Sequence, residues 1–289
     1  EIYLGFIIHH IAFDGWSIEI LLNEIDILYK SFSNRILEID KIHKLPLLEI
    51  QYKDFSNWQK KYLSKGIFEK QMKYWEDKLE GFQNLIIPVD KIRPLEFDFI
   101  GKNVCFEVDE FISDNLNHLA KELQVSLFSL LLSAFYLLMN SYSNKPDIII
   151  GTPVFNRHYQ QIENLIGFFV NSLALRFYID QEMLVHDFIK MVNNGVIEAQ
   201  QNQDLPFEKL VDKIVTTRNP GQHPIFQIMF GLQNHNPNLT QKEHISNKIK
   251  PYKSLYDLFS PAKFDLSLHI DNSEKNLQGA FNYSVSLFH

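Results

Sequence analysis

The residues whose types and spacing could do chemistry lie in one short stretch, GFIIHHIAFDG at positions 5–15. An apolar run ends there in two adjacent histidines, His9 and His10, and Asp14 and Gly15 follow a short step further on. Imidazole titrates near neutral pH, so a histidine within hydrogen-bond reach of a reacting group can accept or guide a proton. Asp14 can hold the loop through a cation. Gly15 lets the backbone take a conformation barred to other residues, or lets a substrate approach closely.

The element that must position these residues is a predicted strand over residues 1–10. Because successive side chains of a strand point to opposite faces, His9 and His10 cannot both face one cavity. We therefore predict that one imidazole is packed and hydrogen-bonded, while the other is free to face solvent or a substrate. The strand is apolar on both faces and needs neighbouring strands, which nothing before it supplies, so we expect that an amino-terminal portion is missing.

The sequence argues against several other kinds of site and partner. The diverging histidine pair lacks the i, i+4 spacing of helical metal ligands, and Cys105 is the single cysteine, so we expect no metal site. No G-x-S-x-G, Walker or G-x-G-x-x-G motif is present. The net charge is −7 with scattered basic residues, which argues against nucleic acid or a membrane surface as partner. Without a signal peptide or membrane span, a cytoplasmic location is predicted.

The periodicity of apolar residues predicts a mixture of helices and strands without strict alternation, which indicates an α+β fold of packed layers. A helix capped by Ser17 is expected after the histidine loop, and a long helix over 49–81 is expected to be interrupted near Gly66 and stopped by Gly81. Connections are expected at 34–48 and 235–262. Further helices are predicted at about 110–123, 126–142, 183–200 and 206–215, and strands at about 102–108, 147–154, 165–179, 225–233, 264–270 and 276–283.

The stretch HHIAFDGWS at 9–17 resembles the H-H-x-x-x-D-G motif of the condensation domains of nonribosomal peptide synthetases, relatives of chloramphenicol acetyltransferase. Later stretches are similar to that family's later motifs, in the family's order. They are YKDFSNWQ at 52–59, IGFFVNSLALR at 166–176, NQDLPFEKLVD at 202–212, RNPGQHPIFQIMF at 218–230 and the closing FNYSVSLF at 281–288.

The resemblance implies a chloramphenicol acetyltransferase-like fold, in which two α/β sandwich lobes form a V-shaped pseudo-dimer. The histidine motif would lie at the lobe junction, where a tunnel admits a pantetheine arm from each side. Residues 1–48 would be a remnant of an incomplete first lobe, with the histidine loop and the helix after it. Residues 49–289 would be the second lobe.

The resemblance implies an acyltransferase that forms peptide bonds. The amine of an aminoacyl thioester on a downstream carrier protein would attack the thioester carbonyl of an upstream donor. The substrates would ride on phosphopantetheine arms of the two carriers, with an adenylation domain as neighbour and no cofactor bound by the domain itself. The tunnel needs both lobes, so this chain alone could be inactive.

The resemblance also assigns roles to single residues. His10 matches the functional histidine of the motif and His9 the structural one. His10 could act as a general base, or could position the amine and stabilise the tetrahedral species, and both roles stay open. The N–H of Gly15 would contact the oxyanion. Arg157 would hold Asp14 and so brace the loop, and Asn171 would face the tunnel or the lobe interface.

Alternative functions remain beside condensation. The histidines contradict the cyclising members of the family, which carry aspartates there, and IGFFVNSL resembles the bond-forming members more than the epimerising ones. A non-catalytic docking module of the same fold, or a free-standing acyltransferase, are the alternatives. The motif leans slightly towards a D-configured donor.

Overall fold

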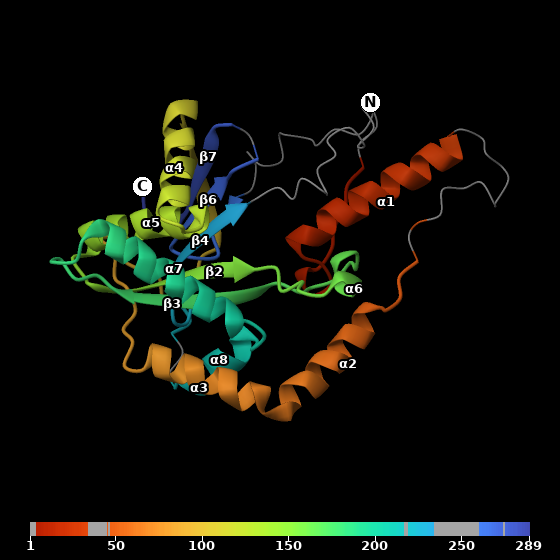
Figure 1. Ribbon diagram of the computed structural model, residues 1–289, viewed down its shortest axis with the longest axis horizontal. Coiled ribbons are helices and arrows are strands. Elements are labelled where there is room, and N and C mark those ends of the chain that lie inside the picture. Colours follow the sequence, from red (N-terminus) through yellow and green to blue (C-terminus); the bar gives the residue numbers. More distant parts are fainter. Residues whose placement is uncertain (1–3, 34–44, 46, 217–218, 234–259, 274) are drawn as a thin grey trace. The chain divides into compact units, whose positions relative to one another are not determined.

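The computed structural model describes residues 4–33, 45, 47–216, 219–233, 260–273 and 275–289 (Figure 1). These residues form two compact units. The described part of the first unit comprises residues 4–33, 45, 47–68 and 155–171. The second comprises residues 69–154, 172–216, 219–233, 260–273 and 275–289. The predicted connection at 34–48 and the predicted loop at 235–262 fall largely outside the described residues, and the predicted domain boundary at 48/49 stays a prediction.

The first unit is built from helices, and the strand predicted for residues 1–10 is wrong over its described part. Residues 4–9 have no regular secondary structure, and His10 opens a short 3-10 turn. An extended segment becomes a strand only through hydrogen bonds to a neighbour, and the described residues place none beside it. The helical elements are the 3-10 turn η1 (His10–Ala12), α1 (Gly15–Ser33), α2 (Tyr52–Tyr62), the π-turn η3 (Leu63–Ile67) and α6 (Gln160–Glu163).

The predicted interruption of the long helix near Gly66 is confirmed. Helix α2 passes through η3 into α3 (Phe68–Leu79), and Gly66 breaks the helical path with a φ of +79°. Gly81, just after α3, has a φ of +63°. Both values lie in the left-handed region that only glycine enters without strain, which explains why the helix breaks and ends at these residues.

The second unit is organised around a seven-stranded sheet with the order β3-β2-β4-β6-β7-β1-β5. Strands β2, β4 and β6 run parallel, whereas β6, β7, β1 and β5 pair antiparallel. The part of the predicted strand 165–179 that precedes β3 is wrong, since residues 165–170 are irregular. The strands are β1 (Ile100–Val108), β2 (Asp147–Val154), β3 (Asn171–Tyr178), β4 (Ile228–Gln233), β5 (Ser260–Pro261), β6 (Leu266–Asp271) and β7 (Leu277–Ser284).

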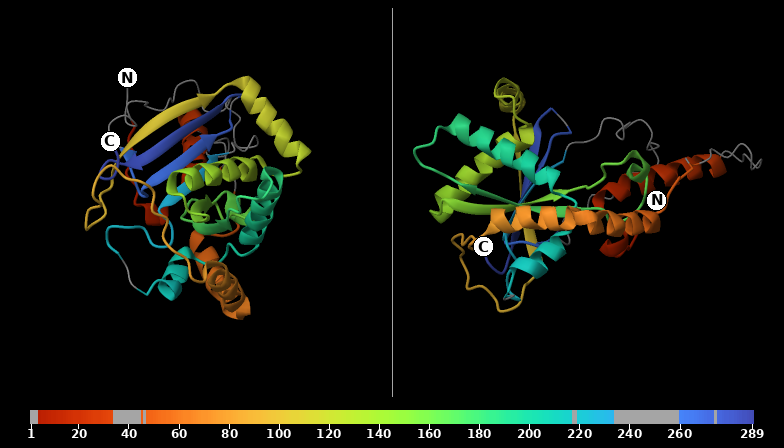
Figure 2. Two further views of the ribbon diagram at one scale, coloured as in Figure 1. Left: turned by 90° about the vertical axis from the view of Figure 1, so that its left-hand side faces the viewer. Right: turned by 60° about the horizontal axis from the view of Figure 1, so that its bottom comes forward.

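Helices of this unit begin where capping side chains satisfy their first N–H groups. Asp109 accepts the N–H of Ile112 at the start of α4 (Glu110–Glu122), and Ser126 accepts that of Ser129 at the start of α5 (Leu127–Ser143). Helix α5 lies beside α7 (Val185–Gln201) over the sheet (Figure 2), and α8 (Phe207–Ile214) follows. The α+β prediction is confirmed.

Alternation along the strands gives the sheet two different faces. Phe230 of β4 and Phe281 of β7 point to one face, where their rings lie 5.8 and 6.4 Å from that of Phe135 on α5. On the opposite face, the ring of Phe226 fills the space beside Gly151 of β2. The core of the second unit is therefore aromatic on both sides of the sheet.

Among the described residues, no single helix is long and apolar enough to cross a membrane. Helices α4 and α5 have the length and apolar composition of a membrane span only when taken together, and they are bent by 106° relative to each other.

We expect Gly151→Ala to destabilise the second unit. A Cβ at this position would lie 2.1 Å from the nearest atom of the Phe226 ring, and that ring is 1% exposed and has little room to move. Overpacking of this kind costs about 1–3 kcal/mol. Urea unfolding measures the change. The control is Gly5→Ala, since a Cβ there meets no atom within 4 Å. Equal unfolding midpoints for the two variants would contradict the packing described here.

Candidate active site

The two histidines lie in the segment that leads into α1, and their rings have different partners. Nδ1 of His9 accepts the N–H of Ile11 at 3.1 Å, which stabilises the 3-10 turn. The ring of His10 packs edge-on against Phe168, with centroids 5.3 Å apart. Strand alternation does not separate the two rings, because the described residues form no strand here; the difference comes from the turn that begins at His10.

The hydrogen bond of His10 determines where the ring carries its proton. Nδ1 lies 2.6 Å from the carbonyl oxygen of Phe13. Because a carbonyl only accepts, Nδ1 must be the protonated nitrogen in this orientation. In the neutral ring, Nε2 then carries the lone pair, and the side chain is exposed. His10 thus offers a proton acceptor at its outer nitrogen.

Helix α1 begins at Gly15, and Asp14 rather than Ser17 caps it. Asp14 Oδ1 accepts the N–H of Ser17 at 3.0 Å and its hydroxyl at 2.7 Å. The prediction that Ser17 caps the helix is wrong, because Asp14 precedes the first helical residue and Ser17 is already inside the first turn. The carboxylate also suits the positive end of the helix dipole.

The structure brings Asp14 and Arg157 together in the first unit. Nη2 of Arg157 donates to Oδ1 and Oδ2 of Asp14 at 3.1 and 3.3 Å, and the two side chains are 2% and 1% exposed. Burial lowers the pKa of the Arg157 guanidinium, and the Asp14 carboxylate opposes that shift. A charge pair so fully removed from water persists only when further hydrogen bonds complete it.

Arg157 also contacts backbone oxygens and an aromatic ring. Nη1 donates to the carbonyl oxygens of Ile162 and Leu165, both at 2.7 Å. The guanidinium carbon lies 4.1 Å from the centroid of the Phe169 ring, a cation–π contact. Arg157 therefore organises the loop of residues 157–169 while it holds Asp14.

A second set of bonds joins the start of α1 to the same loop. The hydroxyl of Ser17 lies 3.1 Å from both the N–H and the carbonyl oxygen of Gly167, and Asp14 Oδ2 accepts the N–H of Phe169 at 3.0 Å. A Cβ on Gly167 would come within 2.3 Å of the Tyr52 ring, so glycine is required for this close approach.

Tyr52 adds a support that the sequence did not single out. Its hydroxyl donates to the carbonyl oxygen of Phe168 at 2.7 Å, and its ring lies 5.1 Å from that of Phe169. Burial and the nearby Asp14 carboxylate raise the pKa of Tyr52. Ser17, Tyr52 and Gly167 all lie within the motif-like stretches of the sequence, and nothing in their spacing reveals these contacts.

The structure shows where Gly15 and Asn171 lie, but the roles predicted for these two residues stay predictions. Gly15 is the first residue of α1, so its N–H has no acceptor within the helix, and a Cβ on it would meet no atom within 4 Å. The φ of Gly15 is not in the left-handed region, so the expectation that Gly15 adopts a backbone conformation barred to other residues is wrong. The other expectation, a close approach of substrate to Gly15, stays a prediction. Asn171 begins β3 and is half-buried. The described residues hold no cluster of three or more metal-binding side chains.

Comparison with known proteins identifies the family. The model of the condensation domain matches residues 1–289, and the chain belongs to this family. It is 36% identical over 285 residues to a linear gramicidin synthase of Brevibacillus parabrevis, covering 98% of this chain and 5% of that protein. It is 35% identical over 288 residues to N-(5-amino-5-carboxypentanoyl)-L-cysteinyl-D-valine synthase of Amycolatopsis lactamdurans, covering 100% of this chain and 8% of that protein.

Solved structures show the same fold. A four-domain nonribosomal peptide synthetase bound to AMP and glycine superposes with a TM-score of 0.78 at 23% identity, over 98% of this chain and 22% of that one. The X-domain from teicoplanin biosynthesis gives a TM-score of 0.82 at 19% identity, over 98% and 64%. The predicted family and its chloramphenicol acetyltransferase-like fold are thereby confirmed. The chain spans less than a tenth of the length of the two synthases.

We expect Asp14→Asn to unfold the first unit at lower denaturant concentration. The variant leaves the buried Arg157 charge without its counter-charge, which costs about 3–5 kcal/mol. The matched control is Asp77→Asn, which removes a carboxylate from the exposed pair that Lys73 and Asp77 form at 2.6 Å on α3. We expect no measurable change there. Urea unfolding of both variants measures the comparison. A similar loss of stability in the two variants would show that the buried Asp14–Arg157 pair stabilises the first unit no more than an exposed ion pair does.

Proposed function

We propose that the chain provides the histidine loop and the sheet-containing lobe of a condensation domain that forms peptide bonds between carrier-bound substrates. The observation that carries the proposal is the hydrogen bond from His10 Nδ1 to the Phe13 carbonyl, which leaves Nε2 as an exposed acceptor. The buried Asp14–Arg157 pair fixes the end of this loop, where α1 begins. A fixed acceptor beside a rigid loop is suited to guiding an amine.

In the proposed reaction, the amine nitrogen of a downstream aminoacyl thioester attacks the carbonyl carbon of the upstream acyl thioester. The new C–N bond forms, the C–S bond then breaks, and the proton lost by the amine goes to the departing pantetheine thiolate. Nε2 of His10 would accept the hydrogen bond, or the proton, of that amine. The general-base and positioning roles therefore use the same atom.

Gly15 would supply the N–H that faces the developing oxyanion. Its N–H precedes the first hydrogen bond of α1, at the positive end of the helix dipole, and the space beside its Cα is open. Asp14 and Arg157 would position the loop without touching the reacting atoms, and Asn171 would contact the substrate tunnel or the lobe interface.

The proposed partners are the upstream and downstream carrier proteins, with an adenylation domain as a neighbour. Support comes from the relatives, whose names are those of peptide synthases, and from the four-domain synthetase with the same fold. The substrates would arrive on phosphopantetheine arms, and we propose that the domain itself binds no cofactor and works in the cytoplasm.

A docking function is the second candidate, because the X-domain of the same fold has been solved in complex with OxyB. Such a module would recruit a partner without forming a bond. If this chain is a docking module, removing the His10 imidazole should leave carrier-bound amide formation unchanged.

We expect His10→Ala to lower carrier-bound amide formation by about 100- to 10,000-fold, the range that a general acid–base group supplies. The natural protein that contains this chain is mixed with a loaded donor carrier and a loaded acceptor carrier, and the amide is followed by mass spectrometry. The control is His118→Ala, because His118 lies on α4 outside the site. Unchanged amide formation in a folded His10→Ala variant, or no amide from the parent protein with matched carriers, would favour docking instead.

We expect Gly15→Ala to fold normally and still lose activity. The added methyl group meets no protein atom within 4 Å, and the φ of Gly15 suits alanine, so the urea midpoint stays at or above that of the parent. The methyl group would instead occupy the open space where the thioester carbonyl is proposed to lie, and amide formation is expected to fall at least tenfold. Full activity in this variant would exclude a close approach of substrate to Gly15.

A further inference from the structure

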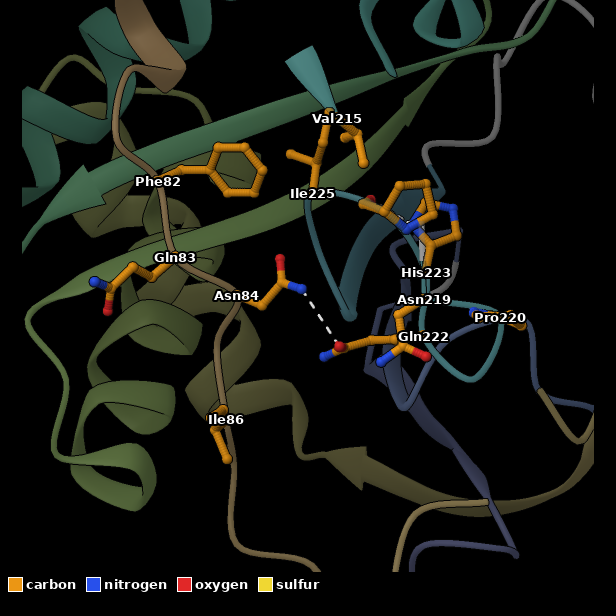
Figure 3. A pocket seen from close by; sticks show the side chains of 11 residues that line it. Phe82, Gln83, Asn84, Ile86, Val215, Asn219, Pro220, Gln222, His223 and Ile225 are labelled. Carbon is orange, nitrogen blue, oxygen red and sulfur yellow. Dashed lines mark hydrogen bonds between the residues drawn. The ribbon is translucent and has the colours of Figure 1, made fainter. Parts of the chain in front are cut away.

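A cavity of about 640 Å³ lies in the second unit, in a part of the chain that the proposed reaction does not use. Two segments line it, residues 82–86 on one side and Val215 with residues 219–225 on the other. Figure 3 shows Asn84 and Gln222 pointing toward each other, whereas Gln83 points away from them. Its volume falls within the range of about 300–1,000 Å³ that is usual for small-molecule sites.

The lining has a distinctive chemistry. Side-chain amides come from both segments, namely Gln83, Asn84, Asn219 and Gln222, and among the described lining residues none is acidic, lysine or arginine. The remaining wall is apolar. Each amide carries donors and an acceptor, so its natural complement is another amide rather than an ion.

His223 adds an acceptor with a fixed tautomer. Its Nδ1 lies 2.9 Å from the carbonyl oxygen of Pro224 and 3.0 Å from that of Phe226, so Nδ1 must be the protonated nitrogen. Burial lowers the pKa of His223, which keeps the ring neutral at neutral pH. Nε2 is then an acceptor, held in place by stacking of the ring on Phe207 and packing against Phe264.

The backbone next to His223, at residues 221–225, is strained and closely packed. Ile225 has a φ of +68°, a conformation that is costly for a β-branched residue, and it is 1% exposed. The neighbouring Gly221 lies so close to Pro94 that a Cβ would be 2.5 Å from the Pro94 carbonyl oxygen. Strain of this kind persists where the surrounding structure fixes a segment, and it is common at binding sites.

One contact across the cavity is easily exchanged for a ligand. Asn84 donates to the side-chain oxygen of Gln222 at 3.3 Å, at the long end of hydrogen-bond distances (Figure 3). Both side chains are at least partly exposed. Replacing this weak bond by two bonds to a ligand amide loses little and leaves every group paired.

We propose that this cavity binds an uncharged, peptide-like amide, with the side chains of Asn84 and Gln222 pairing with its amide groups and His223 Nε2 accepting one of its N–H groups. The apolar wall, which includes the partly exposed Phe82 and Val215, takes up the aliphatic part of the ligand. The lining includes no residue of the His10 loop, and the proposal does not depend on the function proposed for that loop.

The test uses the natural protein and a capped dipeptide, N-acetyl-photoleucyl-glycine N-methylamide, whose diazirine labels its binding site on illumination. We expect saturable labelling within residues 82–86 or 219–225, mapped by mass spectrometry and competed by N-acetyl-leucyl-glycine N-methylamide. The dipeptide with free, charged termini should compete at least tenfold more weakly, because the described lining offers no counter-charge.

Two variants and a matched control make the assignment specific. Gln222→Met and His223→Phe keep the size of each side chain and the aromatic stack, and each should weaken labelling at least tenfold. Gln278→Met makes the same change on β7, outside the lining, and should alter it less than twofold. His10→Ala should leave labelling unchanged, which separates this site from the proposed reaction. Labelling that is not saturable, maps elsewhere, or is equal in all variants would overturn the proposal.

Discussion

The buried pair of Asp14 and Arg157 is the interaction on which the histidine loop depends. Two charges so fully removed from water are stable only when further hydrogen bonds compensate for the water that they lose. That requirement explains why the start of α1, the hydroxyl of Ser17 and the backbone of residues 162–169 converge on them. The position of His10 follows, because its ring lies four residues before the anchored carboxylate and packs on Phe168.

Elements whose boundaries depend on local chemistry were predictable from the sequence. The left-handed glycines at 66 and 81 act within a few residues of the chain, so the predicted interruption and end of the long helix follow from them. The strand predicted over 1–10 is wrong for residues 4–10, its described part, because pairing with a neighbour, rather than apolar character, makes a strand. The cap at Ser17 is wrong because Asp14 takes that role.

The candidate site shows the same division. The chemistry of His10 follows from its residue type, but the tautomer depends on a bond to the Phe13 carbonyl that no pattern reveals. Arg157 was found only through the family resemblance, since it is separated from Asp14 by 143 positions. The bridging role of Ser17 and the support from Tyr52 are products of tertiary packing alone. Long-range hydrogen bonds are thus the part that sequence reasoning misses.

Most bonds that anchor the histidine loop end on main-chain atoms. Arg157 donates to the carbonyl oxygens of Ile162 and Leu165, and Asp14 and Ser17 bind the backbone of Gly167 and Phe169. Main-chain atoms are common to every amino acid, so most side chains between 158 and 168 are not fixed by the anchor. The exposed side chains of this loop can therefore change without loss of the anchor, as long as the backbone path, the buried Ile162 and Leu165 and the glycine at 167 are kept.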